Sequence, residues 1–176
     1  MIPVILQIVK HGIVSEDPPD AREELRVRAP QIQAEILDLL GRALVIRQVD
    51  AGSCNGCELE IHALNNPYYN IEGLGIRFAA SPRHADLLLV TGPVTRNLEL
   101  ALRKTYEAMP APRLVVAVGA CGCSGGIFQT NYASLGGVDQ VLPVDVYIPG
   151  CPPRPESVID GLMKLQDMIA AGAQRY

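Results

Sequence analysis

The sequence contains no tryptophan, only two phenylalanines and no extended basic run. Its 15 Lys and Arg residues are outnumbered by 19 Asp and Glu residues, which gives a net charge of −4. A chain with this balance has little electrostatic attraction for phosphate backbones, and it has few aromatic rings on which bases would stack. We therefore expect no nucleic-acid partner.

Long apolar runs are also missing. The most apolar stretches, in residues 85–90 and 114–118, have the length of strands, whereas a membrane-spanning helix needs about 20 residues. The first fourteen residues are apolar but include Gln7, Lys10 and His11, and they lack the basic start and cleavage site of a signal peptide. We expect a cytoplasmic protein whose five cysteines stay reduced, so that clustered cysteines bind metal.

The 176 residues, 48% of them hydrophobic, divide into two predicted regions. Residues 1–42 are expected to form an N-terminal arm, and residues 43–176 one globular domain. Within the arm, residues 16–28 hold eight charged residues and two prolines, which favours an extended link. Residues 31–40 show the apolar spacing of a short helix.

The second region alternates between strand and helix patterns. Strands are predicted at residues 43–49, 75–79, 85–91, 113–118 and 145–148, and helices at residues 58–64, 95–108 and 156–171. Thr95 is the expected N-cap of the middle helix. This alternation predicts a three-layer α/β domain with a mainly parallel sheet. In such sheets, ligands bind beyond the carboxyl ends of the strands.

Cysteines follow three of these strands. Cys54 and Cys57 follow the first, Cys121 follows the fourth and Cys151 follows the fifth, so all four are expected at one edge of the sheet. Four thiolates in glycine-rich loops with no nearby pair of histidines favour a 4Fe-4S cluster. Structural zinc is the competing metal, and a redox-active CxxC pair is a third possibility that leaves two of the four cysteines without a role.

Cys123 is the fifth cysteine and stands two residues after Cys121. It is an alternative ligand by spacing alone. The strand-end position and the glycine-rich turn that follows favour Cys121 instead, and free buried cysteines are common in protein cores. We therefore expect Cys123 to be a bystander.

Five segments around these cysteines carry a resemblance to a known family. They are residues 52–61 (Gly-Ser-Cys-Asn-Gly-Cys-Glu-Leu-Glu-Ile), 81–86 (Ser-Pro-Arg-His-Ala-Asp), 91–95 (Thr-Gly-Pro-Val-Thr), 119–128 and 144–153. In this order they resemble the small subunits of NiFe hydrogenases, above all the membrane-bound, energy-converting type such as formate hydrogenlyase. The resemblance extends over about residues 43–165.

The resemblance implies a flavodoxin-like fold that holds one 4Fe-4S cluster on Cys54, Cys57, Cys121 and Cys151. No cysteine follows Cys151, so a second cluster is not expected. The implied partners are a large subunit that carries the NiFe site, a ferredoxin-like iron–sulfur subunit and membrane-arm subunits. The chain would then be an oxidoreductase subunit on the cytoplasmic side of the cell membrane that relays electrons during H2 evolution or uptake.

The homologous subunit of respiratory complex I is the main alternative. That subunit characteristically has two adjacent cysteines at the position where this chain has Cys54-Asn55-Gly56-Cys57. The spacing favours the hydrogenase branch, while a complex I-like quinone oxidoreductase subunit that carries the terminal 4Fe-4S cluster stays open. A zinc-stabilised assembly module without a redox role is the second alternative.

Other residues give weaker signals. Glu60 is a candidate proton relay between subunits, and an interface ion pair or a cap for the loop helix is the alternative. Arg83 and His84 would either tune the cluster or form a simple turn. The glycine pairs lack the spacing of nucleotide-binding loops, and the cysteines occupy the strand ends where FMN would bind. The apolar N-terminal segment is a candidate docking element for another subunit.

Overall fold

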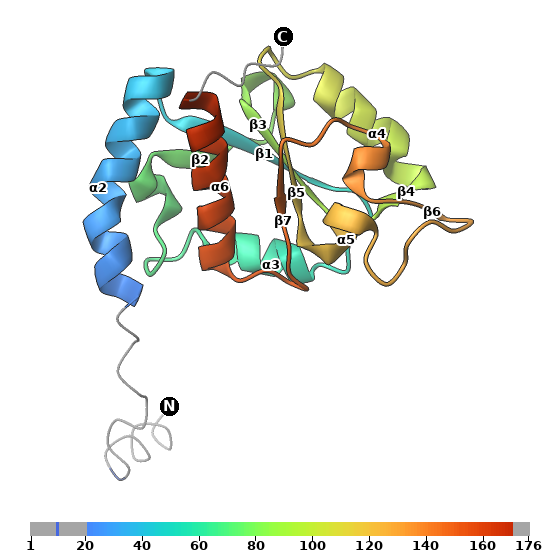
Figure 1. Ribbon diagram of the computed structural model, residues 1–176, viewed down its shortest axis with the longest axis horizontal. Coiled ribbons are helices and arrows are strands. Elements are labelled where there is room, and N and C mark those ends of the chain that lie inside the picture. Colours follow the sequence, from blue (N-terminus) through green and yellow to red (C-terminus); the bar gives the residue numbers. More distant parts are fainter. Residues whose placement is uncertain (1–9, 11–20, 171–176) are drawn as a thin grey trace.

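The structure, a computed structural model, describes residue 10 and residues 21–170, without the side chains of residues 21–27, 39, 40 and 170. The docking segment and the first part of the link predicted in the arm therefore lie outside the described residues. The main sheet has five parallel strands in the order β2-β1-β3-β5-β7 (Figure 1). They are β1 (Leu44–Asp50), β2 (Ile76–Phe78), β3 (Leu87–Thr91), β5 (Leu114–Val118) and β7 (Val146–Ile148).

This strand order is that of flavodoxin-like domains, which confirms the predicted fold class. The helices are α2 (Ala21–Leu40), α3 (Gly56–Ala63), α4 (Arg96–Glu107), α5 (Gly119–Ser124) and α6 (Pro155–Ala170). Three short 3-10 helices, η1 (Ile71–Leu74), η2 (Pro82–His84) and η3 (Val138–Gln140), lie in the connections. β4 (Val94–Thr95) and β6 (Ser134–Gly136) form a separate antiparallel pair.

The central strands are apolar on both sides because helices cover both faces of the sheet (Figure 1). In β3, Leu87 and Leu89 belong to the core that α2, α3 and α6 cover. The alternate residues Leu88 and Val90 belong to a second core, which contains Leu102 of α4. The period of two along the strand thus divides one apolar run between two layers of helices.

Helix α2 is longer than the sequence suggested. The predicted extended link of residues 16–28 is wrong from Ala21 onward, because the helix begins there and continues through Pro30. The segment is rich in Ala, Arg, Glu and Leu, which are strong helix formers whatever their charge. Ile32 and Ile36 are buried in the core beside the sheet, and they anchor this helix to the domain. The division at residue 43 stays a prediction.

Thr95 occupies the predicted N-cap position of α4, but its hydroxyl does not cap the helix. Instead, its Oγ1 donates a hydrogen bond of 3.1 Å to the carbonyl oxygen of Ala51, and its backbone N–H donates one of 2.8 Å to the same oxygen. Because Ala51 directly follows β1, these two bonds join the start of α4 to the loop that carries the first two cysteines.

Candidate metal centre at the carboxyl edge of the sheet

The four predicted ligands lie in three loops at the carboxyl ends of β1, β5 and β7, the lower edge of the sheet in Figure 1. Cys57 lies in the first turn of α3, and Cys121 lies in α5. Cys54 and Cys151 are exposed, whereas Cys57 and Cys121 are half-buried. The parallel sheet therefore brings together cysteines that are distant in the sequence.

Glycines let the three loops approach the sulfur atoms closely. A Cβ added to Gly119 would lie 2.6 Å from Cys57 Sγ, and one added to Gly126 would lie 2.8 Å from Cys121 Sγ. Both glycines also have positive φ angles, of 83° and 55°. A Cβ on Gly56 would lie 3.5 Å from Cys54 Sγ and 3.9 Å from the ring of Pro152, the residue after Cys151. The first cysteine loop thus adjoins the second at the Cys57 sulfur and the third at the ring of Pro152.

The thiols of Cys57 and Cys121 are each influenced by the charges of other cysteines of the set, so the four share one environment. Burial, followed by the charges of Glu58 and of the other three cysteines, raises the pKa of the Cys57 thiol to about 12. Burial, followed by the charges of Cys151 and Cys54, also raises the pKa of Cys121. Without a cation beside them, the thiols of Cys57 and Cys121 keep their protons at neutral pH.

This donor set fits the iron–sulfur cluster that the sequence predicts. Metal binding supplies the positive charge that such thiols need in order to ionise, and a coordinating thiol loses its proton. A 4Fe-4S cluster takes four cysteine thiolates, each on a different iron, and therefore requires four sulfurs around a body larger than one ion. Within the described part of the chain, no group of three or more His, Cys, Asp or Glu side chains is arranged to hold a metal ion.

The thiol of Cys123 makes hydrogen bonds to the main sheet instead. Its thiol donates to the carbonyl oxygens of Ala117 and Ile148, at 3.7 and 3.6 Å, and is half-buried between β5 and β7. Burial raises its pKa, and the hydrogen bond to Ile148 lowers it in part. The contacts agree with the expected bystander role.

Glu58 stabilises the first cysteine loop by accepting hydrogen bonds, a role that the sequence did not predict. Its side chain is only 7% exposed, and Ser53 Oγ donates a 2.6 Å hydrogen bond to Glu58 Oε1. The hydroxyl of Thr91, at the end of β3, donates to the same oxygen. Asp50 fixes the start of the loop by accepting hydrogen bonds from the N–H groups of Gly52 and Ser53, at 2.7 and 2.6 Å. The sequence offered only a partial clue, a serine five residues before this acidic residue, whereas Thr91 is distant in the sequence.

Glu60 lies half-buried on α3, close to a second polar pair. Tyr69 Oη donates a 2.8 Å hydrogen bond to Glu156 Oε1, which connects the loop after α3 to the first turn of α6. Burial and this hydrogen bond raise the pKa of Tyr69 to about 12, and the charge of Glu60 contributes in the same direction. Glu60, Tyr69 and Glu156 thus form a polar group whose two carboxylates follow the first and the last cysteine loop in the sequence.

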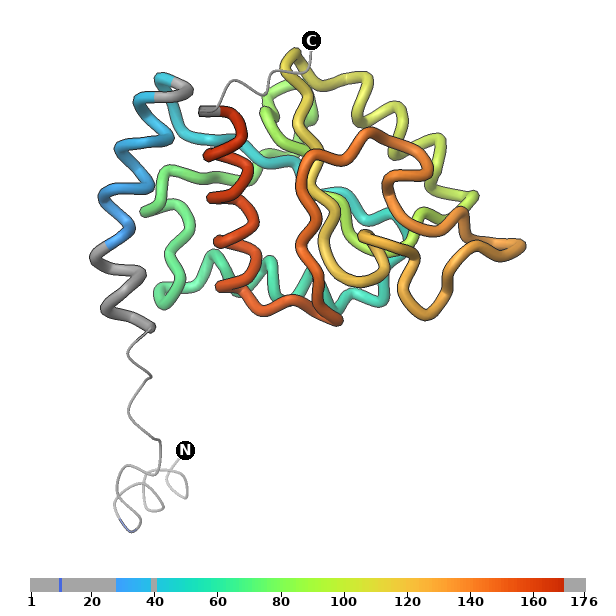
Figure 2. Tube along the Cα trace, viewed as in Figure 1, coloured from blue at the N-terminus to red at the C-terminus, as the bar shows by residue number. Residues whose placement is uncertain are grey.

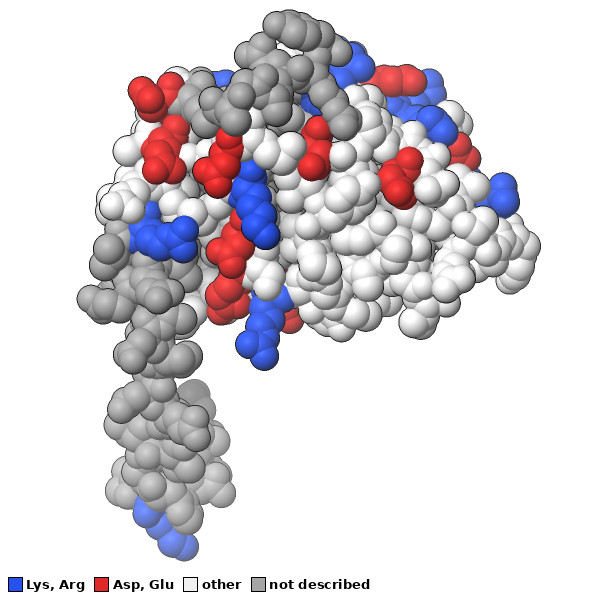
Figure 3. Space-filling model, viewed as in Figure 1, with Lys and Arg blue, Asp and Glu red and all other residues white. Residues whose placement is uncertain are grey.

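An apolar surface extends from the cysteine edge. The loop of residues 125–133, between α5 and β6, projects from the body of the molecule (Figure 2). Over α5 and the lower part of this loop, the face in Figure 3 carries no Lys, Arg, Asp or Glu, while Arg96, whose Nε donates a 3.0 Å hydrogen bond to the carbonyl oxygen of Tyr132, lies beside the loop. Large apolar side chains are exposed there and beside it: Ile127 at 90%, Phe128 at 49%, Tyr132 at 94% and Tyr147 of β7 at 46%. We call these four residues the apolar patch.

Arg83 and His84 lie in η2, which precedes β3, whereas the cysteine loops follow the far ends of the strands. Both side chains are exposed, and their position favours a simple turn over a direct effect on the cluster.

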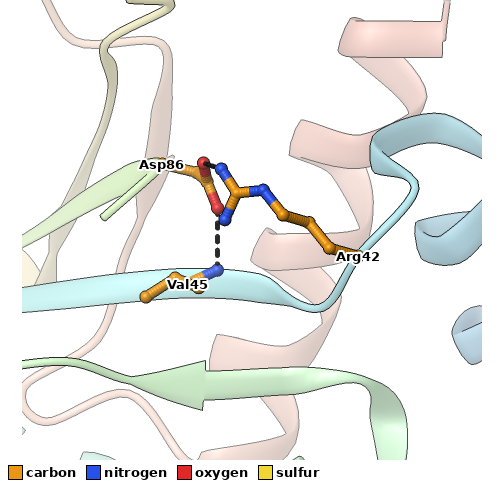
Figure 4. Close-up of polar contacts among 3 residues, drawn as sticks. All are labelled: Arg42, Val45 and Asp86. Atoms are coloured by element: carbon orange, nitrogen blue, oxygen red, sulfur yellow. Dashed lines mark hydrogen bonds and ion pairs between the residues drawn. The ribbon is translucent and has the colours of Figure 1, made fainter. Parts of the chain in front are cut away.

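Asp86 of the same motif has a structural role (Figure 4). Its Oδ2 accepts a 3.0 Å hydrogen bond from the N–H of Val45, and its Oδ1 pairs with Arg42 at 2.5 Å.

Comparison with known proteins gives several close relatives. The chain is 41% identical over 145 residues to a probable membrane-bound hydrogenase subunit of Pyrococcus furiosus, with 82% of this chain and 87% of the relative covered. It is 45% identical over 130 residues to formate hydrogenlyase subunit 7 of Escherichia coli, covering 74% of this chain and 51% of that protein. It is also 52% identical over 114 residues to a subunit of the NADH-quinone oxidoreductase of a Geobacter species, covering 65% of this chain and 66% of that protein.

Solved structures of related complexes also contain chains similar to this one. A chain of the membrane-bound sulfane sulfur reductase, an archaeal respiratory membrane complex, superposes with a TM-score of 0.67 at 38% identity, covering 82% of this chain and 77% of that one. A chain of an NAD+-reducing NiFe hydrogenase has a TM-score of 0.57 at 21% identity, covering 72% of this chain and 92% of that one, and it supports the fold. In the described residues, no helix is both long and apolar enough to cross a membrane.

The family model described as the 20 Kd subunit of NADH ubiquinone oxidoreductase matches residues 54–165, a span that begins at the first of the four cysteines and includes them all. Relatives with this domain are subunits of multi-subunit hydrogenases and respiratory complexes. The chain belongs to this family of oxidoreductase subunits.

Proposed function

We propose that this chain is the electron-transfer subunit of a membrane-bound NiFe hydrogenase and that Cys54, Cys57, Cys121 and Cys151 hold one 4Fe-4S cluster. The observation that carries the proposal is the meeting of these four thiols, from three loops, at one edge of the sheet. When bound, such a cluster supplies one-electron transfer. The chain itself provides the ligands, the partly buried setting and the rigid loops, while hydrogen chemistry takes place in the partner subunit.

The spacing of the first two cysteines supports the hydrogenase branch. Identity alone does not separate the branches, because the relatives named as hydrogenase subunits and those named as quinone oxidoreductase subunits are similarly close. In this chain two residues, Asn55 and Gly56, stand between Cys54 and Cys57, and Asn55 adopts a left-handed conformation with φ of 72°. The adjacent pair that is typical of complex I is absent. A complex I-like subunit that carries the terminal cluster is the alternative.

The apolar patch is the proposed contact surface for the large, NiFe-bearing subunit. Its loop begins beside Cys121, because a Cβ on Gly126 would lie 2.8 Å from Cys121 Sγ, and Tyr147 precedes the Cys151 loop in the sequence, so that a subunit docked there would lie close to the cysteines. Large contiguous apolar patches that lack charge are typical of protein interfaces. A ferredoxin-like iron–sulfur subunit and membrane-arm subunits complete the proposed assembly, with this chain bound peripherally on the cytoplasmic side.

Metal analysis of the native complex tests the proposal. The complex is purified anaerobically through a tag on this chain, and its nickel, iron and zinc are measured against a tagged Cys151→Ser control. We expect about one nickel per complex, with iron in excess and lower iron in the control. Iron without nickel would move the protein to the quinone-linked branch. Zinc in place of iron and sulfide would refute an electron-transfer role.

Glu60 is proposed as a proton relay between this chain and the large subunit. It is three residues from Cys57, it is half-buried, and it lies beside the Tyr69–Glu156 pair. A carboxylate there can take a proton from one side and release it on the other. Glu60→Gln is expected to slow hydrogen turnover without loss of iron, whereas Glu72→Gln, at an exposed position in η1, serves as the control. Full hydrogen turnover in the Glu60→Gln variant would refute the proposed relay role of Glu60.

A further inference from the structure

A cleft of about 420 Å³ opens beside the first cysteine loop and is separate from the cysteines. Its walls come from β1, α3 and the end of β2, and they include Arg47, Asp50, His62 and Phe78. The volume is in the range of small-molecule sites, which are mostly apolar with a few fixed polar groups. None of the roles assigned above uses this cleft.

Arg47 is the unusual residue in the wall. It interrupts the apolar strand β1, directly after the fully buried Ile46. Its Nε is buried and has no hydrogen-bond partner, and among the described residues its guanidinium forms no ion pair. Burial removes water from the Nε donor and no group of the described residues replaces it, which costs free energy. In the described part of the chain, the one acidic wall residue, Asp50, accepts two backbone N–H groups of the cysteine loop on its Oδ1 and forms no ion pair with Arg47.

The rest of the wall suits a group with both an anionic end and an apolar body. His62 and Asn65 offer donors from the end of α3 and the turn after it, and Phe78 and Ile61 provide apolar surface. Guanidinium binds carboxylates through two parallel hydrogen bonds, which are stronger than neutral ones. We propose that this cleft is a binding site for a carboxylate on a small apolar body, with Arg47 as its counterion. The proposal does not depend on the cluster or on the hydrogenase assignment.

The same chemistry has two possible sources, a free carboxylic acid or an acidic side chain of a neighbouring subunit. Arginine modification by phenylglyoxal, followed by peptide mass spectrometry, distinguishes them. It is applied to the full-length chain and to the dialysed native complex, with and without benzoate, and with benzyl alcohol as the uncharged control. Arg77, which is exposed on β2 and outside the cleft, is the internal reference.

In the full-length chain, we expect benzoate to slow modification of Arg47 severalfold and to leave Arg77 unaffected. If the occupant is free, Arg47 of the dialysed complex reacts until benzoate is added. If a partner residue occupies the cleft, Arg47 of the dialysed complex is already protected. Equal rates with and without benzoate in the full-length chain, or equal protection by benzyl alcohol, would overturn the proposal.

Direct binding gives an independent check. Titration calorimetry of benzoate into the full-length chain is repeated with Arg47→Leu, Arg47→Lys and the control Arg77→Leu. Arg47→Leu should weaken benzoate binding about tenfold or more, as expected for the loss of a charge-assisted hydrogen bond. Arg47→Lys should recover part of it, and Arg77→Leu should change nothing. Unchanged affinity in a folded Arg47→Leu variant would refute the site, and if that variant does not fold, the modification experiment on the unaltered chain decides.

Discussion

The hydroxyl of Thr91 donates a hydrogen bond to the buried carboxylate of Glu58, and so links the end of β3 to the helix that begins between the first two cysteines. The same hydroxyl is 3.3 Å from the carbonyl oxygen of Val49 in β1. The second carboxylate oxygen, Glu58 Oε2, is buried and has no partner. The loop of Cys54 and Cys57 is thus supported by one acidic side chain that depends on two hydroxyl groups.

Replacing Thr91 by valine removes one of these donors at nearly constant volume. We expect a loss of about 1–3 kcal/mol in the free energy of unfolding, because a buried acceptor then lacks its partner. The looser loop should also lower iron content after purification. Thr105→Val is the matched control, since the Thr105 hydroxyl bonds only to Ala101 within α4. Chemical denaturation and iron analysis give both readings, and equal behaviour of the two variants would contradict the role of Glu58.

A methyl group at position 119 should prevent cluster binding. The Cβ of Gly119→Ala would lie 2.6 Å from Cys57 Sγ, a distance at which one of the two must move. Gly41→Ala is the control, because Gly41 also has a positive φ, of 65°, but a Cβ there meets no atom of the described residues within 4 Å. Both variants carry about 1–2 kcal/mol of backbone strain. Visible absorbance and iron content should fall only in Gly119→Ala, and equal iron in both would mean that the contact is unimportant.

The sequence predicts the layers of this fold because apolar strands and amphipathic helices alternate along it. It also predicts which cysteines meet, because parallel strands present all their carboxyl ends at one edge. The segment of residues 81–86 shows where such reasoning stops. Its resemblance to the family does not reveal that Asp86 accepts the N–H of Val45 in the neighbouring strand (Figure 4).

Residues whose roles depend on distant partners were harder to predict. Glu58 and Thr91 are 33 positions apart, and no local pattern relates them. The length of α2 was underestimated because charge and proline suggested a link, whereas the buried Ile32 and Ile36 stabilise a helix that propensity alone leaves marginal. Arg47 offered one signal, a charged residue directly after Ile46 in an apolar strand, but the cleft beside it forms only in the folded chain.

Tyr69 should ionise late in an alkaline titration. Its pKa is raised to about 12 by burial and by its hydrogen bond to Glu156. Because the folded chain holds this proton more tightly than the unfolded chain, whose tyrosines have pKa values of about 10, the resulting stabilisation is fully present below about pH 10. It is lost as the pH rises through about 12. Ultraviolet titration should show a late phase that disappears in Tyr69→Phe and persists in Tyr132→Phe, whose ring is 94% exposed.

Cys121 and Cys123 provide the sharpest test of the ligand set, because they are two residues apart in the same short helix. Cys121→Ser should lose most of its iron, since the thiol shares its environment with Cys54 and Cys151. Cys123→Ser should keep its iron, because a serine hydroxyl can still donate to the carbonyl oxygens of Ala117 and Ile148. The two variants are compared by iron and sulfide content and by the electron paramagnetic resonance spectrum of the reduced cluster. Loss of iron in Cys123→Ser with retention in Cys121→Ser would exchange the two assignments, and retention in both would exclude this helix from the site.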